Sequence, residues 1–199
     1  MEEENKRKPA KVKQAKNSES KKTKRKPVEE ENQRKRKTKQ TKNKTSESRK
    51  PAKAKMNLDE KYMRDALKEA QTAACEDEVP IGAVVVFRGN IIARGHNMVE
   101  RLHDPTAHAE MIALTSATEA MGGKYLDGCT LYVTMEPCPM CAAALNWAQL
   151  ERLVFGAEDP KRGYSLFSPS LLHPKTEVTS GILREECAEI VKNYFKNKR

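Results

Sequence analysis

The sequence predicts an α/β protein of three layers (α/β/α), in which a central five-stranded mixed sheet carries helices on both faces. The first observation is an alternation of helical and strand patterns, in the order helix–strand–strand–helix–strand–helix–strand–strand–helix. The second is a change of composition near residue 56. Residues 1–55 contain 22 Lys or Arg and 8 Asp or Glu, whereas residues 56–199 contain 16 and 20. We therefore expect the folded domain at residues 56–199.

The basic segment, residues 1–55, is predicted to be a disordered tail. It contains no Phe, Trp, Tyr, Leu or Ile, so it cannot bury enough apolar surface to offset the entropy cost of ordering. Two interpretations stay open. The tail either contacts RNA phosphates as an electrostatic arm, or it keeps the protein soluble without a specific partner. Without aromatic residues it has no platform on which bases could stack.

The first half of the folded part predicts a helix, a hairpin and a second helix. Residues 57–74 place apolar side chains at helical spacing after Asn57, a plausible N-cap. Two apolar, β-rich segments at 81–87 and 91–95 flank an Arg-Gly-Asn turn and indicate a hairpin. After a polar loop, a helix is expected from about residue 108 to 121, where two glycines follow and end it.

The second half predicts three strands and two helices. Apolar strands are expected at 129–134 and 152–157, with a short helix from Cys138 to about residue 149 between them. A loop rich in Pro, Gly and Ser precedes a weak strand at 176–181. Residues 182–195 predict a final amphipathic helix.

Four residues at two of these helix starts indicate metal chemistry. Cys138 and Cys141 are three residues apart, so both sulfurs can face the same way, and a helix N-terminus favours their thiolate form. With His108 as a third ligand, a zinc site would keep its fourth position open for water, whose pKa falls to about 7. Glu110 does not share a helix face with His108, which favours a proton carrier over a fourth ligand.

The combination His-x-Glu and Pro-Cys-x-x-Cys is the signature of zinc-dependent deaminases. Two alternatives exist for a Cys-x-x-C motif. A zinc knuckle requires four ligands, and the sequence has no second motif of this kind. A redox pair would not account for the His-x-Glu motif, so the sequence favours a zinc hydrolase.

Residues from about 59 to 199 resemble the bacterial tRNA-specific adenosine deaminases. The stretches that carry the resemblance include "EVPIGAVVV", "HDPTAHAEMIAL", "GGKYLDGCTLYVTMEPCPMC", "LVFGAEDPKRG" and "GILREECAEI". The resemblance implies a cytidine-deaminase-like fold, one Zn²⁺ per subunit and a homodimer. It also implies conversion of the wobble adenosine to inosine in a tRNA anticodon stem-loop, with an arginine tRNA as the expected substrate.

Site residues follow from the same resemblance, position by position. His108, Cys138 and Cys141 would hold zinc, and Glu110 would be the catalytic proton carrier. Four further positions would bind substrate: Asn97, the Ala109 backbone, Asp159 and Phe195. Structural alternatives stay open, because Asn97 could only cap a loop, Asp159 could only form a turn, and Phe195 could belong to the core. Trp147 is expected in the core or at the dimer interface.

Two departures from the family pattern keep a second substrate class open. Pro139 gives "PCPMC", a variant that also appears in guanine deaminases, and residues 162–174 lack the small-residue stretch common in the tRNA enzymes. The first alternative is a guanine or nucleoside deaminase. The second is a non-enzymatic RNA-binding protein with the same fold, and the intact zinc and glutamate motifs argue against this second alternative. A cytoplasmic location is expected from the scattered cysteines and the lack of a long apolar run.

Overall fold

The computed structural model describes residues 49–168 and 171–198. The expected disordered tail lies outside the described residues as far as Ser48, which is also where the chain divides into two units. The first helix, α2, spans Arg49–Cys75 and so begins upstream of Asn57, which is not its N-cap. Alanines and basic residues before Asn57 are good helix formers, and Pro51 is tolerated because it lies in the first turn.

The sheet has five strands, as the sequence predicted, and their order is β2-β1-β3-β4-β5. β1 pairs antiparallel with both β2 and β3, whereas β3, β4 and β5 are parallel. The pairing of β1 with β2 carries a bulge between Val85 and Val86. The strands are β1 Gly82–Phe87, β2 Asn90–His96, β3 Cys129–Met135, β4 Arg152–Ala157 and β5 Glu177–Ser180.

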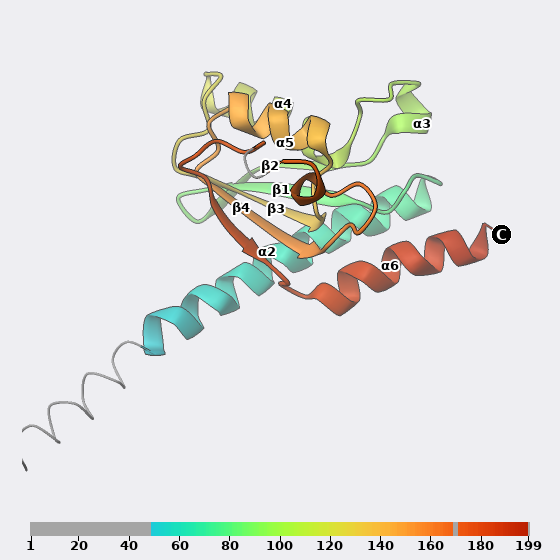
Figure 1. The fold of residues 1–199 in the computed structure, drawn as a ribbon, viewed down its shortest axis with the longest axis horizontal. Coiled ribbons are helices and arrows are strands. Elements are labelled where there is room, and N and C mark those ends of the chain that lie inside the picture. The colour runs from blue at the N-terminus through green and yellow to red at the C-terminus, as the bar shows by residue number, and fades with distance from the viewer. Residues whose placement is uncertain (1–48, 169–170, 199) are drawn as a thin grey trace, which may run out of the picture. The chain divides into compact units, whose positions relative to one another are not determined.

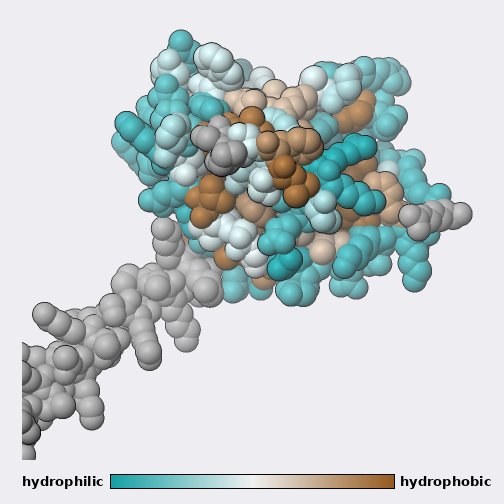
Figure 2. All heavy atoms as spheres, in the orientation of Figure 1, coloured by the Kyte–Doolittle hydropathy of each residue, from teal (hydrophilic) through white to brown (hydrophobic). Residues whose placement is uncertain are grey.

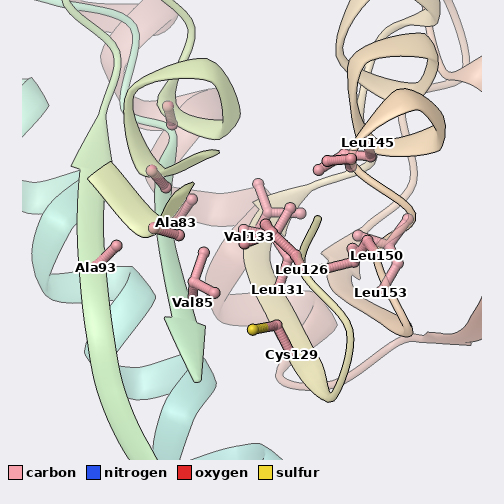
Figure 3. Packing of buried hydrophobic residues seen from close by; sticks show 14 of the residues in the cluster. Ala83, Val85, Ala93, Leu126, Cys129, Leu131, Val133, Leu145, Leu150 and Leu153 are labelled. Carbon is pink, nitrogen blue, oxygen red and sulfur yellow. The ribbon is translucent and has the colours of Figure 1, made fainter. Parts of the chain in front are cut away.

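Helices cover both faces of this sheet and give the three layers (Figure 1). α4 (Ala109–Met121) and α5 (Pro139–Trp147) lie on one face, and α2 and α6 (Arg184–Asn197) lie on the other. Each interface has its own buried apolar cluster. In the cluster below α4 and α5, side chains of β1 and β3 converge with Leu145 of α5 (Figure 3).

Two short helical turns were not predicted, α3 at Val99–Leu102 and η1 at Tyr164–Leu166. Both lie in polar loops and are too short to show a hydrophobic period. None of the described helices is both long and apolar enough to cross a membrane.

Gly82 and Gly95 allow two helices to lie unusually close to the sheet. A Cβ atom at Gly82 would overlap the Ala66 carbonyl of α2, and one at Gly95 would overlap the backbone of Ala109 and Ala113 in α4. Glycine is therefore required at both positions because backbone meets backbone there. The close approach at Gly95 fixes the start of α4, which carries His108 and Glu110.

A buried ion pair ties α2 to strand β4. Arg152 on β4 donates two hydrogen bonds to the two carboxylate oxygens of Asp59 on α2, at 2.8 and 2.7 Å. The Tyr132 hydroxyl of β3 also donates to Asp59, at 2.8 Å. Burial, and then the hydrogen bond to Asp59, raise the pKa of Tyr132. All three side chains are buried or nearly so.

Replacing Asp59 by Ala is expected to lower the free energy of unfolding by about 3–5 kcal/mol, because it leaves the Arg152 guanidinium buried without its counter-charge. Urea unfolding measures this difference. Glu158→Ala is the matched control, since it breaks an exposed pair with Arg184 at 2.8 Å and should change stability by less than about 1 kcal/mol. Equal losses in the two variants would contradict the importance of the buried pair.

Candidate active site

Three ligand atoms converge at the N-terminal ends of α4 and α5. His108 is the N-cap residue of α4, Cys138 is the N-cap residue of α5, and Cys141 lies in the first turn of α5. Pro139 occupies the first turn of α5, where its missing N–H costs no hydrogen bond. The Nδ1 atom of His108 lies 3.6 Å from the Cys138 sulfur and 3.5 Å from the Cys141 sulfur.

These distances fit a tetrahedral zinc ion. Zinc bound to sulfur and nitrogen at its usual bond lengths separates the two ligand atoms by about 3.6 Å. Both separations agree with this value, and all three ligand atoms lie within 4.8 Å of one another. His108, Cys138 and Cys141 therefore form a single metal site with the donor set expected for zinc.

The two cysteines differ in the pKa of their thiol groups. Hydrogen bonds from the Cys141 thiol and from His108 lower the pKa of Cys138 to about 4. The pKa of Cys141 is raised, because its proton bonds to the Cys138 sulfur and because it is buried. The contact between the two sulfurs favours a thiolate at Cys138, and a bound metal would deprotonate Cys141 as well.

Glu110 lies in the first turn of α4, where it is buried and lines the same cleft as His108 and Cys138. Burial raises its pKa to about 7, although the backbone N–H groups at the helix start and the nearby His108 partly oppose this. A carboxyl group of this kind can exchange a proton near neutral pH. Its role as the catalytic proton carrier remains a prediction.

The site opens into a cleft of about 1850 Å³ between the end of α6, the loop after β4 and the loop after α2. Of the residues predicted to contact substrate, this cleft is lined by Asn97, Asp159 and Phe195. Ala109 is fully buried and does not line the cleft, so the contact of its backbone with substrate stays a prediction. The structure therefore brings three of the four positions to one surface with the metal site.

Phe195 and Asp159, two of the predicted substrate contacts, lie in different surroundings. Phe195 is 48% exposed and stacks edge-to-face on Tyr194, so it is not a core residue. Asp159 accepts hydrogen bonds from the backbone N–H groups of Lys161 and Arg162, at 2.9 and 3.1 Å. That arrangement is an Asx turn, which shapes the loop and engages one oxygen of the Asp159 carboxylate.

Two buried glutamates at the cleft were missed by the sequence analysis. Glu78 accepts hydrogen bonds from Asn97 and from the backbone of Arg101. Glu136 accepts hydrogen bonds from the backbone N–H groups of Asp159 and Ser165, at 3.1 and 3.2 Å. Nothing in the sequence separates these two from exposed acids, although the position of Glu136 directly before Pro137-Cys138 is a weak signal.

The comparisons agree with this geometry. The family model of the cytidine and deoxycytidylate deaminase zinc-binding region matches residues 56–157. A tRNA-specific adenosine deaminase of Bacillus subtilis is 47% identical over 149 residues, which are 72% of this chain and 92% of the relative.

Solved structures with the same fold include enzymes of two kinds. One comes from a study of A-to-I editing by tRNA:A34 deaminases at the wobble position. It is 47% identical, has a TM-score of 0.61, and aligns over 65% of this chain and 97% of that one. A guanine deaminase from Nitrosomonas europaea is 27% identical, has a TM-score of 0.59, and aligns over 68% of this chain and 83% of that one.

Proposed function

Because this chain belongs to the zinc-binding cytidine and deoxycytidylate deaminase family, and within it to the tRNA-specific adenosine deaminases, we propose that it converts the wobble adenosine of a tRNA anticodon to inosine. The expected substrate is an arginine tRNA, bound through its anticodon stem-loop. Water is consumed and ammonia is released. The five cysteines are free, which suits a reducing compartment, and we place the reaction in the cytoplasm.

The observation that carries this proposal is the size and character of the cleft above the metal site. Its volume of about 1850 Å³ exceeds the roughly 300–1,000 Å³ of a typical small-molecule site. Six basic side chains line it beside eight acidic ones. Arg101 and Lys198 pair with Glu76 and Asp77, and phosphates are natural partners for the other four: Lys161, Arg162, Lys192 and Lys196. The half-exposed ring of Phe195 offers a surface on which a base can stack. A free purine base needs neither feature.

Each residue of the site then has a defined role in the reaction. When bound, zinc supplies a Lewis acid that makes water nucleophilic near neutral pH. Glu110 takes a proton from the attacking water and delivers it to the purine ring nitrogen next to C6. It later helps the amino group leave as ammonia. Asn97 hydrogen-bonds the flipped nucleotide, and its burial beside the site holds the base in place.

A guanine deaminase is the second candidate, favoured by Pro139 and by the likeness to the guanine enzyme. The two functions are separated by incubating the zinc-loaded full-length protein with an arginine tRNA anticodon stem-loop and, separately, with guanine, adenosine and cytidine. We expect inosine in the stem-loop and no ammonia from the small molecules. Turnover of guanine alone would keep the zinc site and overturn the tRNA substrate.

We also propose a homodimer, formed by an apolar surface on α5 and the segment beside it. Met140 and Trp147 lie seven residues apart on one face of α5, and Trp147 is 84% exposed. Tyr164 and Leu171 lie beside α5, because the Tyr164 N–H donates to the Pro137 carbonyl just before the helix and Asn146 of the helix donates to the Leu171 carbonyl. Leu166 and Phe167 add exposed apolar area there, where Figure 2 shows hydrophobic side chains gathered. Such a patch marks an interface.

Trp147→Glu is therefore expected to convert the protein from dimer to monomer, because it places a charge at the centre of this apolar surface. Sedimentation equilibrium measures the mass. Leu58→Glu, at an exposed apolar residue of α2 on the opposite face of the sheet, is the matched control and should leave the dimer intact. A monomeric wild-type protein, or a Trp147→Glu dimer of unchanged affinity, would contradict this interface.

Removing residues 1–48 is expected to weaken binding of the stem-loop most strongly at low salt, because the deleted segment carries a large excess of Lys and Arg. Turnover at saturating substrate should change little, since the cleft remains complete. Binding is measured by fluorescence anisotropy over a salt series. A salt slope identical to that of the full chain would indicate that the tail does not contact RNA.

A further inference from the structure

We propose that Glu78 is a positioning residue that fixes the orientation of the Asn97 side-chain amide in the cleft. The importance of that amide for turnover rests on the proposed function, whereas its orientation follows from the contacts alone. Glu78 is only 1% exposed, and Asn97 is 5% exposed. Glu78 supplies no ligand atom to the metal site, so it would affect turnover through Asn97.

Both oxygens of Glu78 accept hydrogen bonds. The Asn97 Nδ2 atom donates to Oε2 at 2.9 Å, and the backbone N–H of Arg101 donates to Oε1 at 2.8 Å. Because a carboxylate can only accept, it dictates which end of the amide faces it. A flipped Asn97 would place its oxygen against the carboxylate oxygen, with two acceptors in contact and no proton between them.

With its orientation fixed, the Asn97 amide presents a single arrangement of hydrogen-bond donor and acceptor to a ligand. One N–H of Asn97 is used by Glu78, so the other N–H and the amide oxygen remain for the nucleotide. The main chain of Asn97 is held separately, by its N–H donating to the Ile81 carbonyl at 3.1 Å. The side-chain torsion of asparagine is broad and roughly two-fold, so without Glu78 the amide could present either end.

The two acidic residues before Glu78 hold other walls of the cleft and do not contact the amide. Glu76 accepts from the Arg101 guanidinium at 2.8 Å, and the Asp77 carboxylate pairs with Lys198 at 2.8 Å. Of these three consecutive acids, only Glu78 bonds Asn97. The control is Glu151→Gln, which changes the same chemical group away from the cleft, since Glu151 accepts a hydrogen bond from the Gly128 backbone N–H at 3.0 Å.

The test is a double-mutant cycle of Glu78→Gln and Asn97→Ala, with kcat and KM measured on the stem-loop. Glutamine keeps the volume and an acceptor for Arg101, but it can face Asn97 with either a donor or an acceptor. We expect Glu78→Gln to lower kcat/KM about tenfold, and to have no further effect once Asn97 is Ala. Glu151→Gln should leave kcat/KM within about twofold. Equal effects of Glu78→Gln in both backgrounds would overturn the proposal, because a purely structural role would persist without Asn97.

A second measurement does not depend on activity. In ¹⁵N-labelled protein, the Asn97 side-chain NH₂ signal is identified by its loss in Asn97→Ala. We expect one of its protons to exchange slowly with solvent in the wild type and quickly in Glu78→Gln. Equal exchange rates would contradict the proposal. If guanine is the substrate instead, the proposed function fails, while the cycle run on guanine and this signal still test Glu78.

Discussion

Replacing Glu110 by Gln should lower kcat for deamination by about 1,000-fold, while the protein keeps its zinc. Glutamine preserves the volume and much of the hydrogen bonding of the buried side chain, but it cannot carry a proton. The midpoint of thermal unfolding is not expected to fall, because the change removes an ionisable group from a buried position. Steady-state kinetics on the stem-loop and elemental analysis of the purified protein measure the two effects.

The control for this variant is Glu119→Gln, an exposed residue on the same helix, α4. It should retain full activity and full zinc content. Loss of zinc together with activity in Glu110→Gln would make Glu110 a ligand, contrary to the site described above. Unchanged turnover would assign the proton transfer to another group.

Replacing Cys141 by Ala should abolish zinc binding and reduce deamination to background. The remaining His108 and Cys138 cannot hold the ion in a tetrahedral site, which needs at least three protein ligands to leave one open position. Zinc also stabilises the fold it binds, because the ligands come from two helices that the ion holds together. The wild-type protein should therefore unfold at a lower temperature after chelation, whereas Cys141→Ala should not respond to the chelator.

Cys129→Ala is the matched control, since Cys129 is as fully buried as Cys141 but lies on β3 away from the ligand atoms. It should bind one zinc ion per subunit and keep its response to the chelator. Full zinc occupancy in Cys141→Ala would contradict the three-residue site.

The features that could be predicted are those with a local signal. β4 spans the predicted residues 152–157, and α4 ends at Gly122, which adopts the left-handed conformation that glycine favours. The zinc ligands could be identified because Cys138 and Cys141 are separated by one helical turn and His108 begins a motif of known chemistry. Periodicity and spacing are properties of short segments, so a sequence shows them directly.

The features that could not be predicted depend on tertiary contact or on context. Glu78 looks like Glu76 in the sequence, and only packing makes the first buried and leaves the second at the surface. The cleft gathers Lys161 and Lys196 from segments far apart in the chain. The N-terminal extension of α2 was missed because its basic sequence, poor in apolar residues, has no apolar period, although its residues favour helix.

The most direct test of the account is to treat a full-length arginine tRNA carrying a wobble adenosine with the zinc-loaded protein and then to sequence it. Inosine is read as guanosine, so every adenosine in the molecule is scored at once. We predict conversion at the wobble position alone, lost in Glu110→Gln. An unchanged tRNA, in a preparation that releases ammonia from guanine, would contradict the assignment of this chain as a tRNA adenosine deaminase.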